Sequence, residues 1–333
     1  MAGQTPAPSA WPPAHLRDTG LYSDWNAKIV DPTHLPFSPQ YPLWSDGAVK
    51  RRWLSLPTGT WIDASDVDAW EFPVGTRAWK EFRFSRRAET RLIERRPDGW
   101  RFAAYVWNED ESDAPLAPER GVSRSVEIRP GLHHAIPSRA DCRACHEASP
   151  VRLLGFGALQ LSSDRDPHAV HGESLPEGAV DLAQLVARGL VRNLPGRYAS
   201  RPPRIEARSP IARAALGYLH ANCGSCHVES GEMASLVFAL NYPLGRHGDE
   251  GPPALLTSFA RPSKFRLAND PGPGERVCPS DPDRSVLVVR MASRHPVLQM
   301  PPLGTRLVDE DAVRLARQWI AEEVAAHRRV AER

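Results

Sequence analysis

Residues 89–107 read ETRLIERRPDGWRFAAYVW. Two runs in this stretch, Glu89–Arg96 and Trp100–Trp107, flank Pro97-Asp98-Gly99, which has the composition of a tight turn. Two such runs with a turn between them predict a β-hairpin.

A further run with the pattern of a strand lies before the hairpin. In Ala78–Phe84 the side chains alternate with a period of two, which predicts a strand with two distinct faces. One face carries Lys80, Phe82 and Phe84, and the other carries Trp79, Glu81 and Arg83. Ser123–Arg129 is another strand candidate, and nine of the ten tryptophans lie at or before position 107. We therefore expect an antiparallel β domain over residues from about 40 to 135.

The composition of the chain excludes several classes of protein. Its 333 residues are 41% hydrophobic and 25% charged, the balance of a globular protein of about two domains. A net charge of +2 leaves no basic footprint for nucleic acid or anionic lipid. No apolar run approaches the roughly 18 residues that a membrane helix needs. The 33 prolines predict many loops and few long elements.

Two short cysteine clusters share one pattern. They are Cys142-Arg143-Ala144-Cys145-His146 and Cys223-Gly224-Ser225-Cys226-His227, and each reads C-x-x-C-H. This pattern is the attachment signature of c-type haem. Two thiols at this spacing add to the two vinyl groups of one porphyrin, and the adjacent histidine becomes the proximal ligand of the iron. The sequence therefore predicts two covalently bound haem c groups, attached through Cys142, Cys145, Cys223 and Cys226 and ligated by His146 and His227.

Other interpretations of the cysteines have less support. A zinc ribbon could use two C-x-x-C pairs, but these begin 81 residues apart, whereas a ribbon usually leaves about 15–20 residues. A thioredoxin-like motif needs a βαβ context, which this sequence does not have. Disulfides are a further alternative. The fifth cysteine, Cys278, is expected to be a buried or inert thiol.

Helices are predicted close to both motifs. Residues 139–146 are expected to form a short helix that carries the first motif, and residues 180–191 another helix with an apolar stripe. Ser209 is an N-cap followed by proline, and helical spacing then continues to Cys223. Asp309 is expected to cap a last helix whose stripe is Ala312, Ala316, Trp319 and Ile320.

Each haem iron can take a sixth ligand opposite its proximal histidine. For the second haem we expect Met300, because the two prolines that follow it stiffen the loop and can present the thioether. Met291 lies in an apolar run and is expected in the core, and Met233 in neither role.

The first haem has no such methionine between His146 and the linker. The nearby imidazoles are His133, His134, His168 and His171, of which His134 is the preferred candidate. A five-coordinate iron with an open face is the alternative.

The whole chain resembles a family of dihaem c-type cytochromes of unassigned role from bacterial genomes. The resemblance is carried by YPLWSDGAVK (41–50), FPVGT (72–76), ETR (89–91) with Gly99-Trp100, YVWN (105–108) and IPSRADC (136–142). It implies haem and electron transfer but no substrate.

Each half also resembles a smaller class. Residues from about 205 to 326, with helix, motif, irregular loop, ligand loop and C-terminal helix, resemble a class I cytochrome c domain. The N-terminal half is similar to β-sheet cytochromes of the cytochrome c′-β type and to lysine-cross-linked hydroxylamine-oxidising cytochromes. That similarity singles out Lys80 for a cross-link, although a solvated lysine is the simpler interpretation.

The predicted fold class is therefore α+β. An antiparallel β domain bearing one haem motif is expected to precede an all-α class I cytochrome c domain. The expected division is a Pro-rich N-terminal wrap (1–39), a β-rich haem domain (40–195), a linker (196–204) and the cytochrome c domain (205–333).

The predicted function is that of a soluble dihaem electron carrier. It would pass electrons from a periplasmic dehydrogenase to a downstream cytochrome or oxidase, with the His/Met-ligated haem at the higher potential. Covalent haem attachment in bacteria places it in the periplasm, with the signal peptide absent from this sequence. The alternatives are a haem enzyme that uses an open first haem on peroxide or a small nitrogen compound, and an interaction subunit that docks through the β domain.

Overall fold

The centre of the molecule is a five-stranded antiparallel sheet. This computed structural model describes residues 11–148, 151–245, 251–267 and 274–331. The sheet has the order β3-β4-β6-β7-β8. Its strands are β3 (Leu35–Pro36), β4 (Val49–Ser55), β6 (Arg77–Arg83), β7 (Arg87–Arg96) and β8 (Gly99–Val106). The predicted hairpin is confirmed as β7 and β8, and the predicted strand before it as β6.

The two faces of the sheet are buried against different parts of the chain. Leu54, Ala78, Ile93 and Phe102 are paired across four strands, and all four belong to one apolar cluster on what we call the inner face. Their neighbours one residue along each strand, Trp53, Trp79, Leu92 and Ala103, belong to a separate cluster on the outer face. Alternation of side chains along each strand produces this division.

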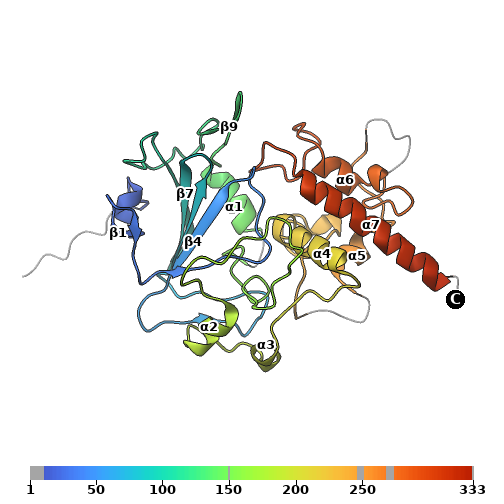
Figure 1. Cartoon of the computed structure of the whole chain (residues 1–333), viewed down its shortest axis with the longest axis horizontal. Helices are drawn as coiled ribbons and strands as arrows, with labels where there is room; N and C mark the ends of the chain where they lie inside the picture. Colours follow the sequence, from blue (N-terminus) through green and yellow to red (C-terminus); the bar gives the residue numbers. More distant parts are fainter. Residues whose placement is uncertain (1–10, 149–150, 246–250, 268–273, 332–333) are drawn as a thin grey trace, which may run out of the picture.

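The N-terminal segment covers the outer face. Residues from 11 onward form the 3-10 turn η1 (Leu16–Thr19) and the strand pair β1 (Tyr22–Asp24) and β2 (Ile29–Val30). Leu16 and Leu21 are fully buried in the outer cluster, and the backbone of Leu16 donates to the carbonyl of Ala114 at 2.9 Å. In Figure 1 this segment lies on the side of the sheet away from the helices. Residues 1–10 of the predicted N-terminal wrap lie outside the described residues.

Small two-stranded pairings surround the main sheet. They are β9 (Glu127–Arg129) with β10 (Leu132–His133), and β5 (Ile62–Asp63) with β11 (Val191–Arg192). Only the last three residues of the predicted strand 123–129 form β9, because Ser125 and Val122 instead hydrogen-bond to His134 and Ile136 outside any regular strand.

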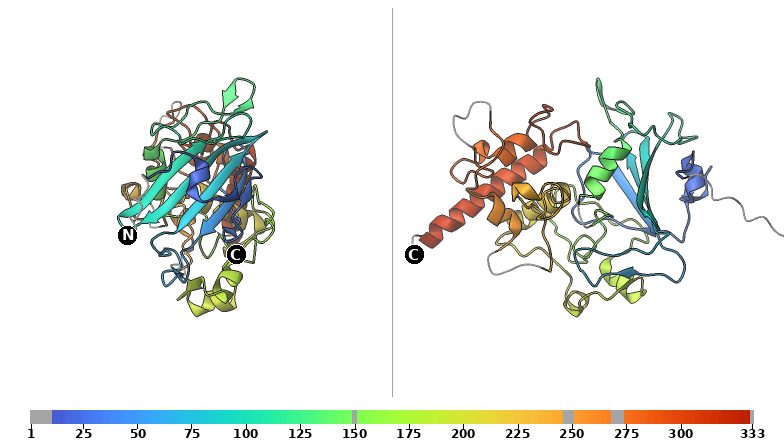
Figure 2. Two further views of the ribbon diagram at one scale, coloured as in Figure 1. Left: turned by 90° about the vertical axis from the view of Figure 1, so that its left-hand side faces the viewer. Right: turned by 180° about the vertical axis from the view of Figure 1, so that it is seen from behind.

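Helices follow the sheet in sequence and lie on its inner side. They are α1 (Arg139–His146), α2 (Leu182–Ala187), α3 (Gly196–Ser200), α4 (Pro210–Asn222), α5 (Pro253–Ser258), α6 (Val286–Met291) and α7 (Glu310–Ala331), with two 3-10 turns, η2 (Ala234–Leu236) and η3 (Pro282–Arg284). Figure 2 shows α1 between the sheet and α4.

The helix ends obey the capping rules expected from the sequence. Ser209 Oγ accepts from the backbone of Ala212 at 3.0 Å, and Asp309 Oδ1 accepts from Ala312 at 3.1 Å. These side chains satisfy backbone groups that have no partner inside the helix. The helices predicted from residues 210 and 310 are therefore confirmed.

The predicted all-α class I cytochrome c domain is wrong. About 23% of the chain is helical, and between α4 and α7 the described residues form only short helices, turns and loops. Two isolated β-bridges, Phe259 with Val277 and Pro262 with Glu275, also lie in this part. The prolines contribute to the difference, because a proline is tolerated in the first turn of a helix, as in α5, but interrupts a helix at any later position.

The C-terminal part also shares its core with the N-terminal part. Tyr41 and Leu159 belong to the same apolar cluster as α4, α6 and α7. A β-carbon on Gly217 would lie 2.1 Å from the ring of Tyr41, so glycine at this position lets the ring pack directly on α4. Nearby, the backbone of Trp44 donates to Asn222 at 2.7 Å. Among the described residues, no helix has both the length and the apolar character to span a membrane.

Candidate functional site

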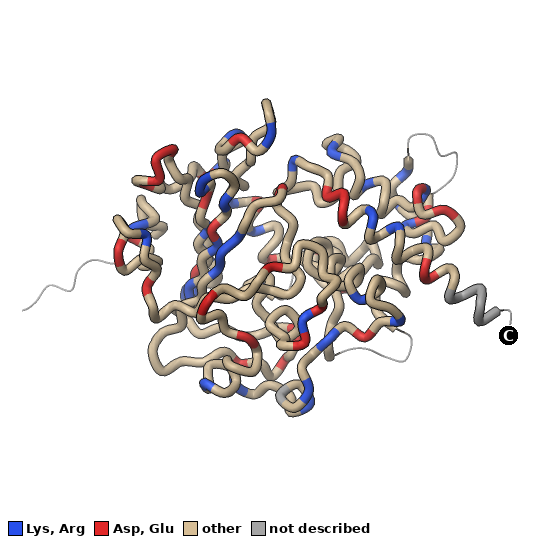
Figure 3. The backbone as a smooth tube through the Cα atoms, in the orientation of Figure 1, with Lys and Arg blue, Asp and Glu red and all other residues tan. Residues whose placement is uncertain are grey.

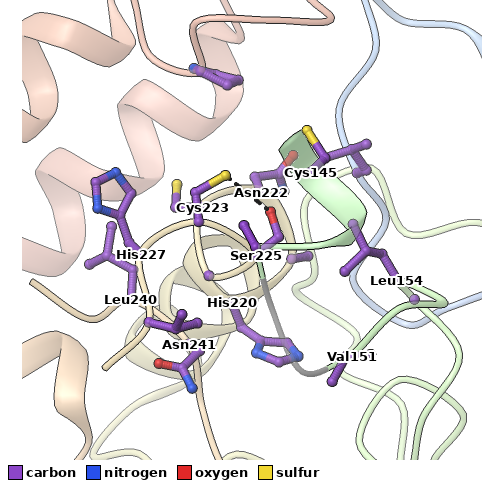
Figure 4. Close-up of a pocket in the computed structure, with 18 of the residues that line it drawn as sticks. Cys145, Val151, Leu154, His220, Asn222, Cys223, Ser225, His227, Leu240 and Asn241 are labelled. Atoms are coloured by element: carbon purple, nitrogen blue, oxygen red, sulfur yellow. Dashed lines mark hydrogen bonds between the residues drawn. The ribbon is translucent and has the colours of Figure 1, made fainter. Parts of the chain in front are cut away.

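One large cavity lies between the inner face of the sheet and the C-terminal helices. Its volume is about 1320 Å³, and all six Cys and His residues of the two C-x-x-C-H motifs line it. Motifs that begin 81 residues apart in the sequence therefore share one cavity. Figure 4 shows the end of α1 with Cys145 facing the turn with Cys223 and Ser225 at the end of α4.

The first motif is held within helix α1. Ser138 Oγ accepts from the backbone of Asp141, and the carboxylate of Asp141 accepts from the backbone of Ser138 at 2.9 Å. This reciprocal pair is a capping box and confirms the helix expected at residues 139–146. The side chain of Cys142 packs against the inner-face cluster of the sheet.

His146 has the environment of a metal-binding imidazole. Its Nδ1 lies 2.7 Å from the carbonyl of Arg152, so Nδ1 donates and the lone pair of Nε2 is left free. The ring also packs on Phe102 at 5.2 Å. Burial lowers the pKa of His146 to about 4, and the charges of Lys80 and Arg91 act in the same direction. The imidazole is therefore neutral, the form that binds a metal ion.

The second motif lies in a turn beyond the end of α4. Cys223 is the C-cap of that helix. A β-carbon on Gly224 would lie 2.6 Å from the carbonyl of His220, so the tight turn requires glycine there. Burial lowers the pKa of His227 to about 4, with a further contribution from Arg290, and its ring packs edge-on against Phe238 at 4.8 Å. Among the described residues, Nδ1 of His227 is buried without a hydrogen-bond partner.

The two motifs meet at their second cysteines. Ser225 Oγ donates to the sulfur of Cys226 at 3.9 Å. The thiols of Cys145 and Cys226 also affect one another: the interaction with Cys145 lowers the pKa of Cys226 to about 6, and the interaction with Cys226 raises the pKa of Cys145, which burial raises further. Burial also raises the pKa of Cys223 to about 12. None of the four motif cysteines is paired in a disulfide.

The three methionines considered from the sequence all line this cavity. Met300 is half-buried, and its backbone donates to the carbonyl of Arg290 at 3.0 Å. Met291 is 7% exposed and belongs to the core of α4, α6 and α7, as expected. Met233 lines the cavity beside η2, which was not expected from the sequence.

The candidate histidines for the first iron lie elsewhere. His134 is 1% exposed, and its Nε2 lies 2.8 Å from a carboxylate oxygen of Glu89. His171 contacts both carboxylate oxygens of Asp309 at 2.9 and 3.0 Å. None of His133, His134, His168 and His171 is among the cavity-lining residues in the described part of the chain.

His220 was not expected from the sequence. It lies three residues before Cys223 on α4 and lines the cavity, and Figure 4 shows it projecting in a different direction from His227. Burial lowers its pKa to about 4. Nδ1 of His220 accepts from the backbone of Tyr242 at 3.1 Å, so Nε2 carries the proton and acts as a donor. The only feature of the sequence that could have indicated a place in the cavity is that His220 lies one helical turn before the second motif.

Cys278 lies outside this cavity lining. It is half-buried, and its sulfur is 3.3 Å from Ser280 Oγ, while its backbone donates to Ser285 at 2.9 Å. Among the described residues, no cluster of three or more His, Cys, Asp or Glu side chains is arranged to hold a metal ion.

The cavity fits the group that the motifs imply. Ligand pockets commonly measure about 300–1,000 Å³, and this one exceeds that range. Aromatic residues from both sides line it, including Phe37, Trp44, Phe102, Phe156, Phe238 and Phe265. The free Nε2 of His146, whose Nδ1 is held by a backbone carbonyl, is also compatible with iron ligation.

Neither a protein-family model, nor a curated protein, nor a solved structure matches the chain.

Proposed function

We propose that this chain is a dihaem c-type cytochrome that transfers electrons between redox proteins. The observation that carries the proposal is that both C-x-x-C-H motifs open onto one cavity of about 1320 Å³. The proposed partners are a periplasmic dehydrogenase and a downstream cytochrome or oxidase.

Different residues of the chain would attach the haems, bind the iron atoms and orient the iron ligands. Cys142 and Cys145 would hold one haem and Cys223 and Cys226 the other, with the neutral imidazoles of His146 and His227 on the iron atoms. The bound haem supplies an iron that alternates between two oxidation states. Arg152 fixes the orientation of His146 through its carbonyl. Because Cys145 and Cys226 are in contact, the two groups would lie close enough for electrons to pass between them without leaving the cavity.

The cavity walls would set the reduction potentials. Burial favours the less charged state of an iron centre, and a thioether ligand raises the potential. Met300 lines the cavity and would provide that ligand at the second haem. Arg276 and Arg290, which influence His227 electrostatically, would oppose the additional positive charge of the oxidised iron.

A haem enzyme is the second candidate. It is favoured by cations that face the cavity beside His146, since Lys80 and Arg91 both influence the pKa of that histidine. Such cations could hold a small anionic substrate near an open first iron. Electron paramagnetic resonance separates the two functions, because a high-spin iron at the first haem supports the enzyme and two low-spin irons support the carrier.

The haem content of the purified chain tests the proposal first. We expect two haems per chain by the pyridine haemochrome assay, both retained on a denaturing gel. Cys142→Ala with Cys145→Ala, and separately Cys223→Ala with Cys226→Ala, should each leave one. As a matched control, Cys278→Ala should leave two. Haem that extracts into acidic acetone would contradict covalent attachment.

The ligand of the second iron is tested by substituting Met300. Met300→Ala should abolish the weak far-red absorption band of a methionine-ligated ferric haem and allow cyanide to bind. Met300→His should also abolish the band but keep the iron low-spin and lower its potential, because imidazole is the stronger donor. Met291→Leu is the control and should keep the band. Retention of the band in Met300→Ala would refute this ligand and direct attention to Met233.

A further inference from the structure

Three basic side chains form a row across the inner face of the sheet. Arg52 on β4 is paired with Lys80 on β6, and Lys80 is paired with Arg91 on β7. Residues paired in this way point to the same face of a sheet, and all three line the cavity. Figure 3 shows basic segments on neighbouring strands of the sheet. Like charges directly opposite one another destabilise a sheet, so the row needs a compensating charge.

The outer two members of the row have carboxylate partners. Arg52, whose side chain is 5% exposed, donates to both oxygens of Glu173 at 2.5 and 3.0 Å. Arg91 donates to both oxygens of Glu89 at 2.7 and 2.9 Å. Each of these arginines is therefore matched to one carboxylate in a bidentate pair.

Lys80, in the middle of the row, has no such partner. Among the described residues, its ammonium group has no carboxylate within ion-pair distance and makes no hydrogen bond. Its closest described interaction is with the ring of Phe82, whose centroid lies 4.8 Å from Nζ, and Arg91 lies over the same ring at 4.4 Å. Burial, together with the charges of Arg52 and Lys50, lowers the pKa of Lys80 well below its usual value.

A fourth basic side chain, Lys50, lies near the row. Lys50 precedes Arg52 by two residues on β4, so it lies on the same face, and it also makes no ion pair among the described residues. Two arginines and two lysines therefore share two carboxylates in this cluster. An anion beside Lys80 would favour the charged form of the lysine and would accept the charge-assisted hydrogen bonds that its Nζ now lacks.

We propose that Lys80, with Arg52 and Arg91 on either side, forms an anion site that takes a carboxylate or a small oxyanion from the cavity. Two sources have this chemistry. One is a propionate side chain of a haem bound at the first motif, and this source rests on the proposed function. The other is a free anion that enters the cavity, and this source does not depend on haem.

Calorimetric titration of the purified full-length protein tests the free anion. Sodium acetate is the probe, with sodium chloride at equal ionic strength as the reference. For a free-anion site, acetate should bind the wild type and bind Lys80→Met at least about tenfold more weakly, because a hydrogen bond to a charged group is lost. Lys80→Arg should restore binding, since it keeps the charge.

Arg83→Met is the matched control. Arg83 lies on the same strand as Lys80 but is exposed and points to the opposite face, so its substitution should leave acetate binding unchanged. Lys80→Gln repeats the neutral substitution with a polar side chain in case Lys80→Met does not fold, which circular dichroism would reveal.

Resonance Raman spectroscopy tests the propionate source. If a propionate occupies the site, acetate should not bind the wild type, and Lys80→Met should shift the propionate bending bands of the haem while Arg83→Met leaves them in place. Absence of acetate binding together with unchanged propionate bands in Lys80→Met would overturn the proposal. If the purified protein carries no haem, the proposed function fails, and acetate binding alone then decides the anion site.

Discussion

The two C-x-x-C-H motifs have the same five-residue pattern but different structural supports. The first lies inside α1, which begins with a capping box and packs against the sheet. The second lies in a turn after α4 and depends on the apolar core of α4, α6 and α7. The pattern thus specifies which atoms are available, whereas the surrounding chain decides how they are held.

The largest effect is expected at the buried ion cluster near the first motif. Glu89 is fully buried and is bound by Arg91 and His134. Glu89→Gln would leave Arg91 buried without its counter-charge and should lower the free energy of unfolding by about 3–5 kcal/mol. Urea denaturation measures this effect. Glu119→Gln removes an exposed ion pair with Arg139 and should change stability by less than about 1 kcal/mol.

The same cluster predicts a pH dependence. Burial alone would raise the pKa of Glu89, but Arg91 and His134 outweigh it and hold the pKa at about 2 instead of 4.5. A carboxyl group with a depressed pKa stabilises the fold fully above its ordinary pKa, and this stabilisation is lost as the pH falls toward the folded value. Unfolding measured between pH 5 and about pH 2 should show this loss in the wild type. Glu89→Gln should lose less, and an equal slope in both proteins would contradict the assignment.

An intermediate effect is expected at the core that supports the second motif. Gly217→Ala would place a β-carbon 2.1 Å from Tyr41, so the ring must shift. We expect a loss of about 1–3 kcal/mol from overpacking, despite the better helix propensity of alanine. Gly196→Ala is the control, because a β-carbon there meets no atom within 4 Å. Thermal unfolding of both variants checks the prediction, and equal stability would show that Tyr41 can move without loss.

The smallest and most discriminating effect is expected at the helix caps. Ser138→Ala and Ser209→Ala each remove a capping side chain and should each cost about 1 kcal/mol. Their consequences for the motifs should differ, because the first motif lies inside its capped helix and the second lies beyond the far end of its own. We expect Ser138→Ala to reduce covalent haem at the first motif and Ser209→Ala to leave the second unchanged, as measured by haem per chain. Equal losses in both variants would contradict the difference between the two supports.

Local sequence signals determined the individual elements well. The turn residues 97–99 and the alternation in residues 78–84 specified β6, β7 and β8, because strand pairing between neighbours depends on short-range pattern and turn chemistry. Ser209 and Asp309 specified the starts of α4 and α7, since a cap acts on the backbone of its own first turn.

The prediction of an all-α C-terminal domain was wrong because it relied only on the order of two helices and a C-x-x-C-H motif along the chain. Two helices and a C-x-x-C-H motif were correctly identified, but their order does not determine what lies between them. The proline-rich segment between the two helices consists of short helices and loops. Tyr41 and Leu159, which lie far away in the sequence, complete its core. No local pattern reveals such a contribution.

The sequence by itself determined which chemistry the chain can offer, namely two pairs of thiols, each with an adjacent imidazole, because this depends only on residue type and spacing. The tertiary structure decided which of these side chains lie close together. It brought Cys145 to Cys226, placed His220 in the cavity, and turned Arg52, Lys80 and Arg91 toward the same space. These residues come from separate strands and helices, and only the pairing of strands and the packing of helices fixes which side chains face one another.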